Sequence, residues 1–187
     1  MLFRSVSQSR SRLDEKEKRF QRTYYSQFDN VVAVSESTKD IFLETFPECS
    51  ERVIVLYDIT NPDFIRRMAE TGDGFDDCFD GLRILTIGRL NRQKGYDIAL
   101  EACKRLKDQG IRFRWYALGK GPLRQEIEAQ IEAMGLEEHF ILLGVKSNPY
   151  PYIKTSDIYV QTSRFEGFGI AIAEARMLNV PIVPTRS

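Results

Sequence analysis

Two basic residues of this 187-residue chain are spaced so that both could bind a diphosphate. Arg89 and Lys94 lie in the segment 88–95, GRLNRQKG, between an apolar run that ends at Ile87 and an amphipathic stretch. Gly88 allows the backbone to turn sharply as it leaves the apolar run. A helix that begins after this segment offers free N–H groups and a positive dipole end to an anion. The segment therefore predicts an anion site, while a solvated basic loop remains an equal alternative.

Two acidic residues further along the chain could bind sugar hydroxyl groups. Glu166 lies in the Gly-rich segment 163–169, and Glu174 lies in an otherwise apolar helical stretch at 170–177. One carboxylate can accept hydrogen bonds from two hydroxyls on adjacent carbons. The alternative is one glutamate at a helix N-terminus and one exposed helix glutamate. The apolar neighbours of Glu174 favour the functional interpretation, because a buried carboxylate without partners is costly.

A third segment, GKGP at 119–122, also follows an apolar run. It matches neither a Walker A loop nor the GxGxxG pattern, because Arg114 and Arg124 stand where those motifs need glycine. A tight turn with Pro122 at the first helical position explains it structurally. By itself this segment is a weak signal.

The elements that must position these segments alternate regularly after residue 82. Apolar runs without polar alternation are separated by amphipathic helices, which is typical of a parallel sheet covered on both faces. We expect strands at 84–87, 113–118, 140–143, 158–161 and 181–183, and helices at 97–107, 123–134 and 170–177. The proline-broken segment 148–155 is expected to form a rigid turn. The predicted fold class is a doubly wound α/β sheet, in which ligands bind beyond the carboxyl ends of the strands.

Residues 1–57 repeat this pattern on a smaller scale. We expect strands at 31–34 and 53–57, a charged helix at 12–25, and a second helix capped by Ser35. Two strands are too few for an independent parallel sheet, so this part is predicted to be the end of a larger α/β domain. The chain also ends soon after a strand, so we expect it to be truncated at both ends.

The segment between the two parts is acidic and rich in Gly and Asp at 68–81, which predicts a linker. A calcium loop is the alternative, but its D-x-D-x-D-G spacing and closing glutamate are missing. The predicted organisation is a remnant of an N-terminal domain at 1–57, a hinge at 58–82, and a second α/β domain at 83–187.

Composition excludes several classes of function. The 27 basic and 27 acidic residues balance, which argues against nucleic-acid binding. Cys49, Cys78 and Cys103 are scattered, so neither a disulfide framework nor a zinc cluster is expected. His139 is the sole histidine, expected at the surface, and the GxSxG motif of Ser-His-Asp hydrolases is missing. The N-terminus lacks the apolar core of a signal peptide, which predicts a cytoplasmic protein.

Four motifs in this order resemble one family. ILTIGRLNRQKG at 84–95, ALGKGP at 117–122, FILLGV at 140–145 and SRFEGFGIAIAEA at 163–175 resemble the C-terminal half of GT-B retaining glycosyltransferases of family 4, also called glycosyl transferases group 1. The E-x7-E spacing of Glu166 and Glu174 is part of this resemblance. The match covers 83–187 and extends to 29–57, which resembles the end of the family's N-terminal domain.

The resemblance implies roles for individual residues. Arg89 and Lys94 would bind the donor diphosphate and stabilise the leaving group, Glu166 would hold the transferred sugar, and Glu174 would hold the ribose. Arg89, Lys94 and Glu166 are therefore the expected catalytic residues. The backbone around Gly144 and Val145 would contact the nucleobase. The remaining expected donor-binding residues, which contribute mainly backbone groups, are Gly88, Gly119, Gly167, Phe168 and Gly169.

The resemblance also implies a reaction. A sugar would move with retention from a UDP- or GDP-sugar to a glycan or lipid-linked acceptor, with no metal or other cofactor and no nucleic-acid partner. The missing part of the N-terminal domain would carry acceptor specificity and would allow peripheral association with the inner face of the membrane. Two alternatives remain, namely a non-catalytic nucleotide-sugar binding module and a structural interaction protein.

Overall fold

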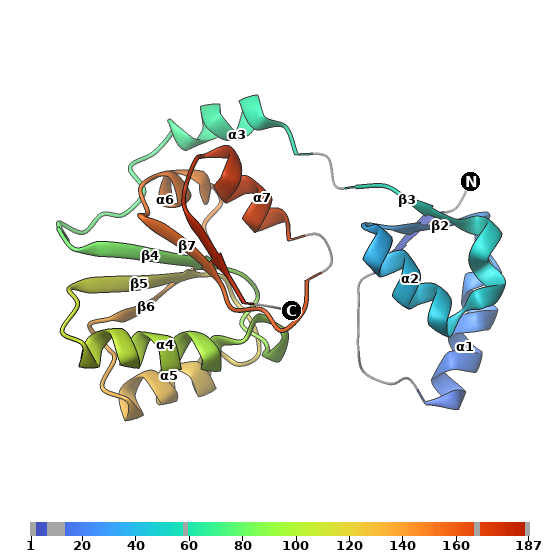
Figure 1. The fold of residues 1–187 in the computed structure, drawn as a ribbon, viewed down its shortest axis with the longest axis horizontal. Helices are drawn as coiled ribbons and strands as arrows, with labels where there is room; N and C mark the ends of the chain where they lie inside the picture. The colour runs from blue at the N-terminus through green and yellow to red at the C-terminus, as the bar shows by residue number, and fades with distance from the viewer. Residues whose placement is uncertain (1–2, 7–13, 58–59, 167–168, 186–187) are drawn as a thin grey trace. The chain divides into compact units, whose positions relative to one another are not determined.

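The computed structural model describes residues 3–6, 14–57, 60–166 and 169–185. The chain forms two compact units, one of residues 1–59 with 166–169 and one of residues 60–165 with 170–187 (Figure 1). Each unit contains its own parallel sheet. No helix in the described part of the chain is long and apolar enough to cross a membrane.

The first unit has a three-stranded parallel sheet in the order β1-β2-β3. Its elements are β1 Phe3–Val6, α1 Glu15–Tyr25, β2 Asn30–Ala33, α2 Glu36–Thr45, the 3-10 helix Pro47–Arg52 and β3 Val53–Val55. The rings of Tyr25, Phe42 and Phe46 pack against one another with centroids 5.0–5.2 Å apart. Ser35 caps α2 as predicted, since its Oγ accepts a hydrogen bond from the backbone N–H of Thr38 at 3.1 Å.

Two elements of this unit were not predicted, and one ends early. The strand β1 is only four residues long and its sequence, FRSV, contains no continuous apolar run. The 3-10 helix Pro47–Arg52 lies where no element was predicted, and β3 ends at Val55 instead of residue 57. The first two residues of the helix predicted at 12–25 lie outside the described part of the chain.

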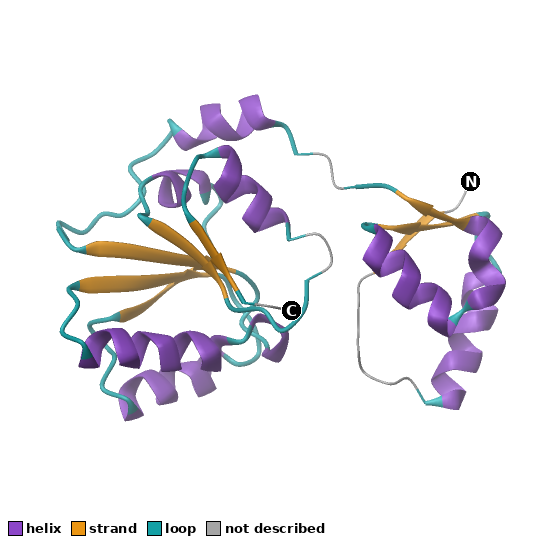
Figure 2. Cartoon of the chain, in the orientation of Figure 1, coloured by secondary structure: helices purple, strands orange, loops and turns teal. Residues whose placement is uncertain are grey.

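The second unit confirms the predicted α/β class with a parallel sheet in the order β6-β5-β4-β7-β8. Its strands are β4 Leu82–Ile87, β5 Phe113–Leu118, β6 Phe140–Gly144, β7 Ile158–Gln161 and β8 Ile182–Pro184. Its helices are α3 Pro62–Ala69, the 3-10 helix Arg92–Lys94, α4 Tyr96–Asp108, α5 Arg124–Ala133, α6 Tyr150–Lys154 and α7 Ile170–Met177. Helices α4 and α5 cover one face, and α6 and α7 cover the other (Figure 2).

The two faces of this sheet carry separate hydrophobic cores. Along β5, Trp115 and Ala117 pack in the core that includes α4 and α5. Their neighbours Tyr116 and Leu118 pack in the core that includes α6 and α7. Because successive strand side chains point to opposite faces, β5 must be apolar at almost every position. This is why the buried strands appear in the sequence as mostly apolar runs without regular polar alternation.

The segment predicted to be a linker contains a helix. Asn61 caps α3 by accepting hydrogen bonds from the N–H groups of Asp63 and Phe64 at 3.1 and 3.0 Å. The helix packs against α6 and α7 within the second unit. Asn148 donates hydrogen bonds from Nδ2 to the carbonyl oxygens of Met68 and Thr71 at its end. Residues 60–69 are therefore structured, and the hinge role of 58–82 stays a prediction.

The acidic stretch that follows α3 is not simply solvated. Asp77 accepts hydrogen bonds from Arg83 Nη2 and Arg114 Nη1, each at 2.8 Å, and from the Tyr116 hydroxyl. Burial acts to raise the pKa of Asp77, but these hydrogen bonds outweigh it and hold the pKa well below its usual range. This network connects the segment before β4 to the strands β4 and β5.

Three further local expectations need correction. Residues 150–154 form the helix α6, because Pro149 and Pro151 occupy positions at its start, where proline is tolerated. Pro122 is not at the first helical position, since α5 begins at Arg124. His139 is half-buried against Phe113, and its Nδ1 is buried without a hydrogen-bond partner among the described residues.

Candidate functional site

The carboxyl ends of three neighbouring strands bring three of the predicted site residues into a row. Gly88 follows β4, Gly119 follows β5, and Gly144 ends β6. The N–H of Gly88 donates to the carbonyl oxygen of Leu118 at 2.9 Å. The N–H of Gly119 donates to the carbonyl oxygen of Gly144 at 2.8 Å. This glycine row, made of Gly88, Gly119 and Gly144, runs along the edge where doubly wound sheets bind ligands.

Glycine is required at two of these positions. Gly119 has a φ of +147°, and a Cβ on it would lie 2.0 Å from the carbonyl oxygen of Gly88. Gly144 has a φ of +72°, and a Cβ there would meet nothing within 4 Å, so the backbone is open above it. Gly88 does not have the positive φ that a sharp glycine turn would show. A Cβ on Gly88 would lie 3.0 Å from the Lys94 side chain, so its small size lets that side chain pack closely.

The two predicted cations lie in the loop that follows Gly88. Arg89 is exposed and forms no ion pair with the described residues. Lys94 is half-buried and ends the short 3-10 helix before α4. Asn91 Oδ1 accepts a hydrogen bond from the backbone N–H of Lys94 at 3.2 Å. The backbone of Lys94 is therefore held in place, whereas Arg89, which directly follows Gly88, is exposed.

Glu174 has the setting that the sequence predicted. It is half-buried on α7, and its Oε1 accepts a hydrogen bond from the Tyr150 hydroxyl of α6 at 3.0 Å. Burial raises the pKa of Glu174, and the hydrogen bond from Tyr150 lowers it by a smaller amount. Burial, followed by the same hydrogen bond, raises the pKa of Tyr150 to about 12. Tyr150 is a residue that the sequence analysis missed, because its segment was expected to be a turn.

The remaining predicted residues are only partly placed. Val145 follows the glycine row and is 61% exposed. Glu166 is half-buried in the loop between β7 and α7, and residues 166–169 group with the first unit. Gly169 has a positive φ of 73°, whereas the predicted positions 167 and 168 lie outside the described residues. Among described residues, no hydrogen bond joins Glu174 to the glycine row.

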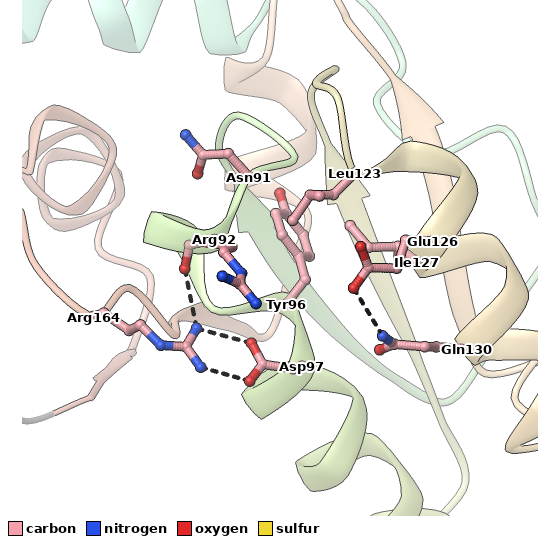
Figure 3. A pocket seen from close by; sticks show the side chains of 9 residues that line it. All are labelled: Asn91, Arg92, Tyr96, Asp97, Leu123, Glu126, Ile127, Gln130 and Arg164. Atoms are coloured by element: carbon pink, nitrogen blue, oxygen red, sulfur yellow. Dashed lines mark hydrogen bonds and ion pairs between the residues drawn. The ribbon is translucent and has the colours of Figure 1, made fainter.

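A pocket of about 430 Å³ lies beside this edge, between the N-terminal ends of α4 and α5 (Figure 3). Its lining residues are Asn91, Arg92, Tyr96, Asp97, Leu123, Glu126, Ile127, Gln130 and Arg164. None of the predicted site residues lines it, although Asn91 and Arg92 belong to the same loop as Arg89 and Lys94. The described residues contain no cluster of three or more His, Cys, Asp or Glu side chains arranged to hold a metal.

Comparison with known proteins identifies the family. Residues 80–187 match the family described as glycosyl transferases group 1. The chain belongs to this family. The match covers all four motifs at the carboxyl edge of the second sheet, which confirms the resemblance inferred from those motifs.

Proteins named as glycosyltransferases are similar to most of the chain. A Campylobacter jejuni N-acetylgalactosaminyltransferase, named for a diphospho-undecaprenol-linked substrate, is 28% identical over 161 residues, or 86% of this chain and 42% of its own length. An uncharacterized glycosyltransferase of Methanocaldococcus jannaschii is 24% identical over 165 residues, or 87% of this chain and 41% of its own length. This chain thus spans about two fifths of these relatives.

Solved structures show the same fold. Anabaena HepE in complex with UDP-glucose superposes with a TM-score of 0.79 at 19% identity, covering 99% of this chain and 53% of HepE. Staphylococcus aureus TarM, in a complex that includes UDP, superposes with a TM-score of 0.73 at 17% identity, covering 97% of this chain and 36% of TarM. The two units of this family member therefore correspond in fold to part of a GT-B glycosyltransferase.

Proposed function

We propose that this chain binds a nucleoside-diphosphate sugar at the carboxyl edge of its second sheet, as part of a retaining glycosyltransferase. The acceptor is a glycan or a lipid-linked glycan. Family membership supports sugar transfer. The UDP complexes of HepE and TarM and the lipid-linked substrate in the name of the Campylobacter relative support the donor and acceptor classes. The observation that carries the proposal is the glycine row with two cations in the loop beside it.

Arg89 and Lys94 bind the diphosphate in this proposal. Negative charge grows on the leaving diphosphate as the bond to the sugar breaks, so fixed cations there stabilise the transition state more than the ground state. The backbone of Lys94 is held by Asn91, and its aliphatic chain packs against Gly88. Less conformational entropy is then lost when it binds the anion. Arg89 is exposed and orders only when the donor arrives.

Glu174 and Glu166 bind hydroxyl groups in this proposal. Tyr150 occupies Oε1 of Glu174, so Oε2 is available to accept hydrogen bonds from the ribose diol. Glu166 and the backbone at 167–169 hold the transferred sugar. The open backbone above Gly144 and the exposed side chain of Val145 leave room for the nucleobase.

The wider organisation is part of the same proposal. Residues 1–57 form the end of an acceptor-side domain, residues 58–82 connect the two parts, and residues 83–187 form the donor-binding part. A cytoplasmic location, with peripheral association at the inner face of the membrane through the acceptor-side domain, suits a lipid-linked acceptor.

Nucleotide titration tests the binding site. We expect amide chemical-shift changes in the 187-residue chain when UDP or GDP is added, concentrated at residues 88–95 and 144–145. Lys94→Ala and Glu174→Ala should each weaken binding about tenfold, the loss of one charge-assisted interaction. Lys104→Ala is the control, because it removes an exposed cation of α4 that pairs with Asp108. Undiminished binding in both site variants would refute the assignment.

A transfer assay separates catalysis from binding. Release of UDP from a UDP-sugar in the presence of a lipid-linked glycan supports the glycosyltransferase. Tight donor binding without transfer or hydrolysis supports the alternative of a non-catalytic binding module. The absence of any nucleotide-dependent shift supports the interaction protein and contradicts both other functions.

A further inference from the structure

We propose that Arg164 is a positioning residue, which holds the loop leading to Glu166 in place against the loop that carries Lys94. This inference rests on the proposed function, because it concerns the geometry between the diphosphate-binding and sugar-binding parts of the donor site. The two loops follow β4 and β7, which are neighbours in the sheet. Arg164 itself is exposed and is not a donor ligand in this proposal.

The guanidinium of Arg164 forms three hydrogen bonds with groups of the β4–α4 region (Figure 3). Its Nη1 and Nη2 donate to Oδ1 and Oδ2 of Asp97 at 2.9 and 2.6 Å. Its Nη1 also donates to the carbonyl oxygen of Arg92 at 3.0 Å. The hydrogen bonds from Arg164 lower the pKa of Asp97, so the carboxylate remains charged. This planar, bidentate arrangement fixes orientation as well as distance, which a lysine could not do.

The backbones of the two loops are joined next to this pair. The N–H of Arg164 donates to the carbonyl oxygen of Gln93 at 2.8 Å, and Gln93 Nε2 donates to the carbonyl oxygen of Phe165 at 3.1 Å. The hydroxyl of Thr162 donates to the carbonyl oxygen of Lys94 at 2.8 Å. Thr162, Arg164 and Phe165 thus all form hydrogen bonds with the segment 92–94. Phe165 immediately precedes Glu166, so this contact fixes the backbone directly before Glu166.

A stabilising role alone does not account for this pair. The side chains of Arg164 and Asp97 are 44% and 56% exposed, and exposed ion pairs contribute little to stability. The pair Lys104–Asp108 on the same helix has similar exposure, 40% and 57%, but lies within one helix. Arg164 and Asp97 instead join segments that are 67 residues apart in the chain. The difference between the two pairs is what they connect, and this makes Lys104→Ala a matched control.

The experiment compares the affinities of UDP and UDP-glucose for the 187-residue chain by calorimetry. The dissociation constant of UDP measures binding at the diphosphate site. The ratio of the two dissociation constants measures how much the sugar adds to the affinity. Arg164→Ala should weaken UDP-glucose binding about tenfold, as misplacement of a positioned group does, and UDP binding less than about twofold. Arg164→Ala and Lys104→Ala should unfold within about 2 °C of each other. If the wild-type chain binds UDP-glucose no more tightly than UDP, a panel of UDP- and GDP-sugars is measured. The experiment then uses the sugar whose dissociation constant is lowest relative to that of its free nucleotide.

A mutant cycle shows whether Arg164 acts through Asp97. Asp97→Ala should reproduce the loss of sugar affinity, and the double variant should be no worse than either single one. Arg164→Lys should recover only part of the lost UDP-glucose affinity, because lysine keeps the positive charge but cannot form the bidentate pair with Asp97. The inference is wrong if Arg164→Ala leaves the ratio of the two dissociation constants unchanged, or if that ratio is one in wild type for every sugar tested. Nucleotide binding would still support the proposed function in both cases. Failure of wild type to bind either UDP or GDP refutes the proposed function itself.

Discussion

Replacing Gly119 by alanine tests whether the loops after β4 and β5 are in direct backbone contact. The new Cβ would lie 2.0 Å from the carbonyl oxygen of Gly88 and 2.9 Å from its carbonyl carbon. Neither atom is the flexible end of a side chain, so the backbone must move. The residue also has a φ of +147°, which alanine rarely adopts. We therefore expect Gly119→Ala to disrupt the glycine row and to destabilise the second unit.

The size of the effect follows from two costs. Relief of the contact requires a shift of roughly 1 Å between two strand ends, and overpacking of this kind costs about 2 kcal/mol. The unfavourable φ costs about 2 kcal/mol more. The expected loss in free energy of unfolding is therefore about 4 kcal/mol, a large share of the total stability of a typical domain, about 5–15 kcal/mol.

Gly110→Ala is the matched control for this variant. Gly110 also has a positive φ, +71°, but a Cβ on it would meet nothing within 4 Å. It carries only the backbone cost, about 1 kcal/mol in the left-handed helical region. Urea unfolding, followed through the fluorescence of Trp115 in β5, measures both variants in the same unit. Equal destabilisation of the two variants would refute the contact between the loops.

Three other predictions use the titratable groups. The pKa of Asp77 is lower in the folded chain than in the unfolded chain. Asp77 therefore stabilises the fold at pH values above its unfolded pKa, and this stabilisation is lost as the pH falls. Asp77→Asn should lower the free energy of unfolding, measured in urea, by about 1–2 kcal/mol at pH 7 and by less in acid. Glu174 has a raised pKa, so UDP affinity should fall as pH drops through that value, and calorimetry should show no such fall in Glu174→Gln. Burial raises the pKa of Cys103 to about 12 and also raises that of Cys49, whereas Cys78 is exposed. An aromatic disulfide reagent should therefore titrate one thiol in the folded chain and all three in denaturant, and a second fast thiol would contradict the buried placement.

The regular part of the fold could be predicted from the sequence because burial on both faces leaves a strong pattern. The strand expected at 113–118 and the helix expected at 170–177 have those same bounds in the structure. In β5, every residue except Arg114 faces one of two cores, so the run is apolar at all its other positions. The loops that carry Gly88, Gly119 and Gly144 could then be located, since the ends of parallel strands define them.

The irregular elements depended on contacts that no local pattern shows. The helix α3 is only eight residues long and lies on α6 and α7, to which Asn148 ties it across 80 residues of sequence. The helix α6 contains prolines that normally indicate a turn, and only their place at its start permits a helix. Asp77 stands in an acidic stretch like that of a linker, but its partners lie in β4 and β5.

The same limit applies to the candidate site. Arg89, Lys94 and Glu174 could be proposed from residue type and spacing. The hydrogen bond from Tyr150 to Glu174, and the pair formed by Arg164 with Asp97, link residues 24 and 67 positions apart. Such links depend on the order of strands in the sheet, which a single sequence does not specify. The residues proposed to bind a ligand could therefore be named from the sequence, whereas these long-range partners could not.

The amino and carboxyl ends of the strands in the second sheet differ in the groups that they carry. At the amino edge, Asp77 binds side chains from β4 and β5, and Asp157 Oδ2 accepts the N–H of Arg83 at 2.7 Å. At the carboxyl edge, the glycines Gly119 and Gly144 lie at the ends of β5 and β6, and a Cβ on Gly144 would meet nothing within 4 Å. An ionic network can fix the strands at one end without obstructing the other. In the proposed function, the backbone at the carboxyl edge approaches the diphosphate closely, Lys94 binds the diphosphate, and Arg164 positions the neighbouring loop.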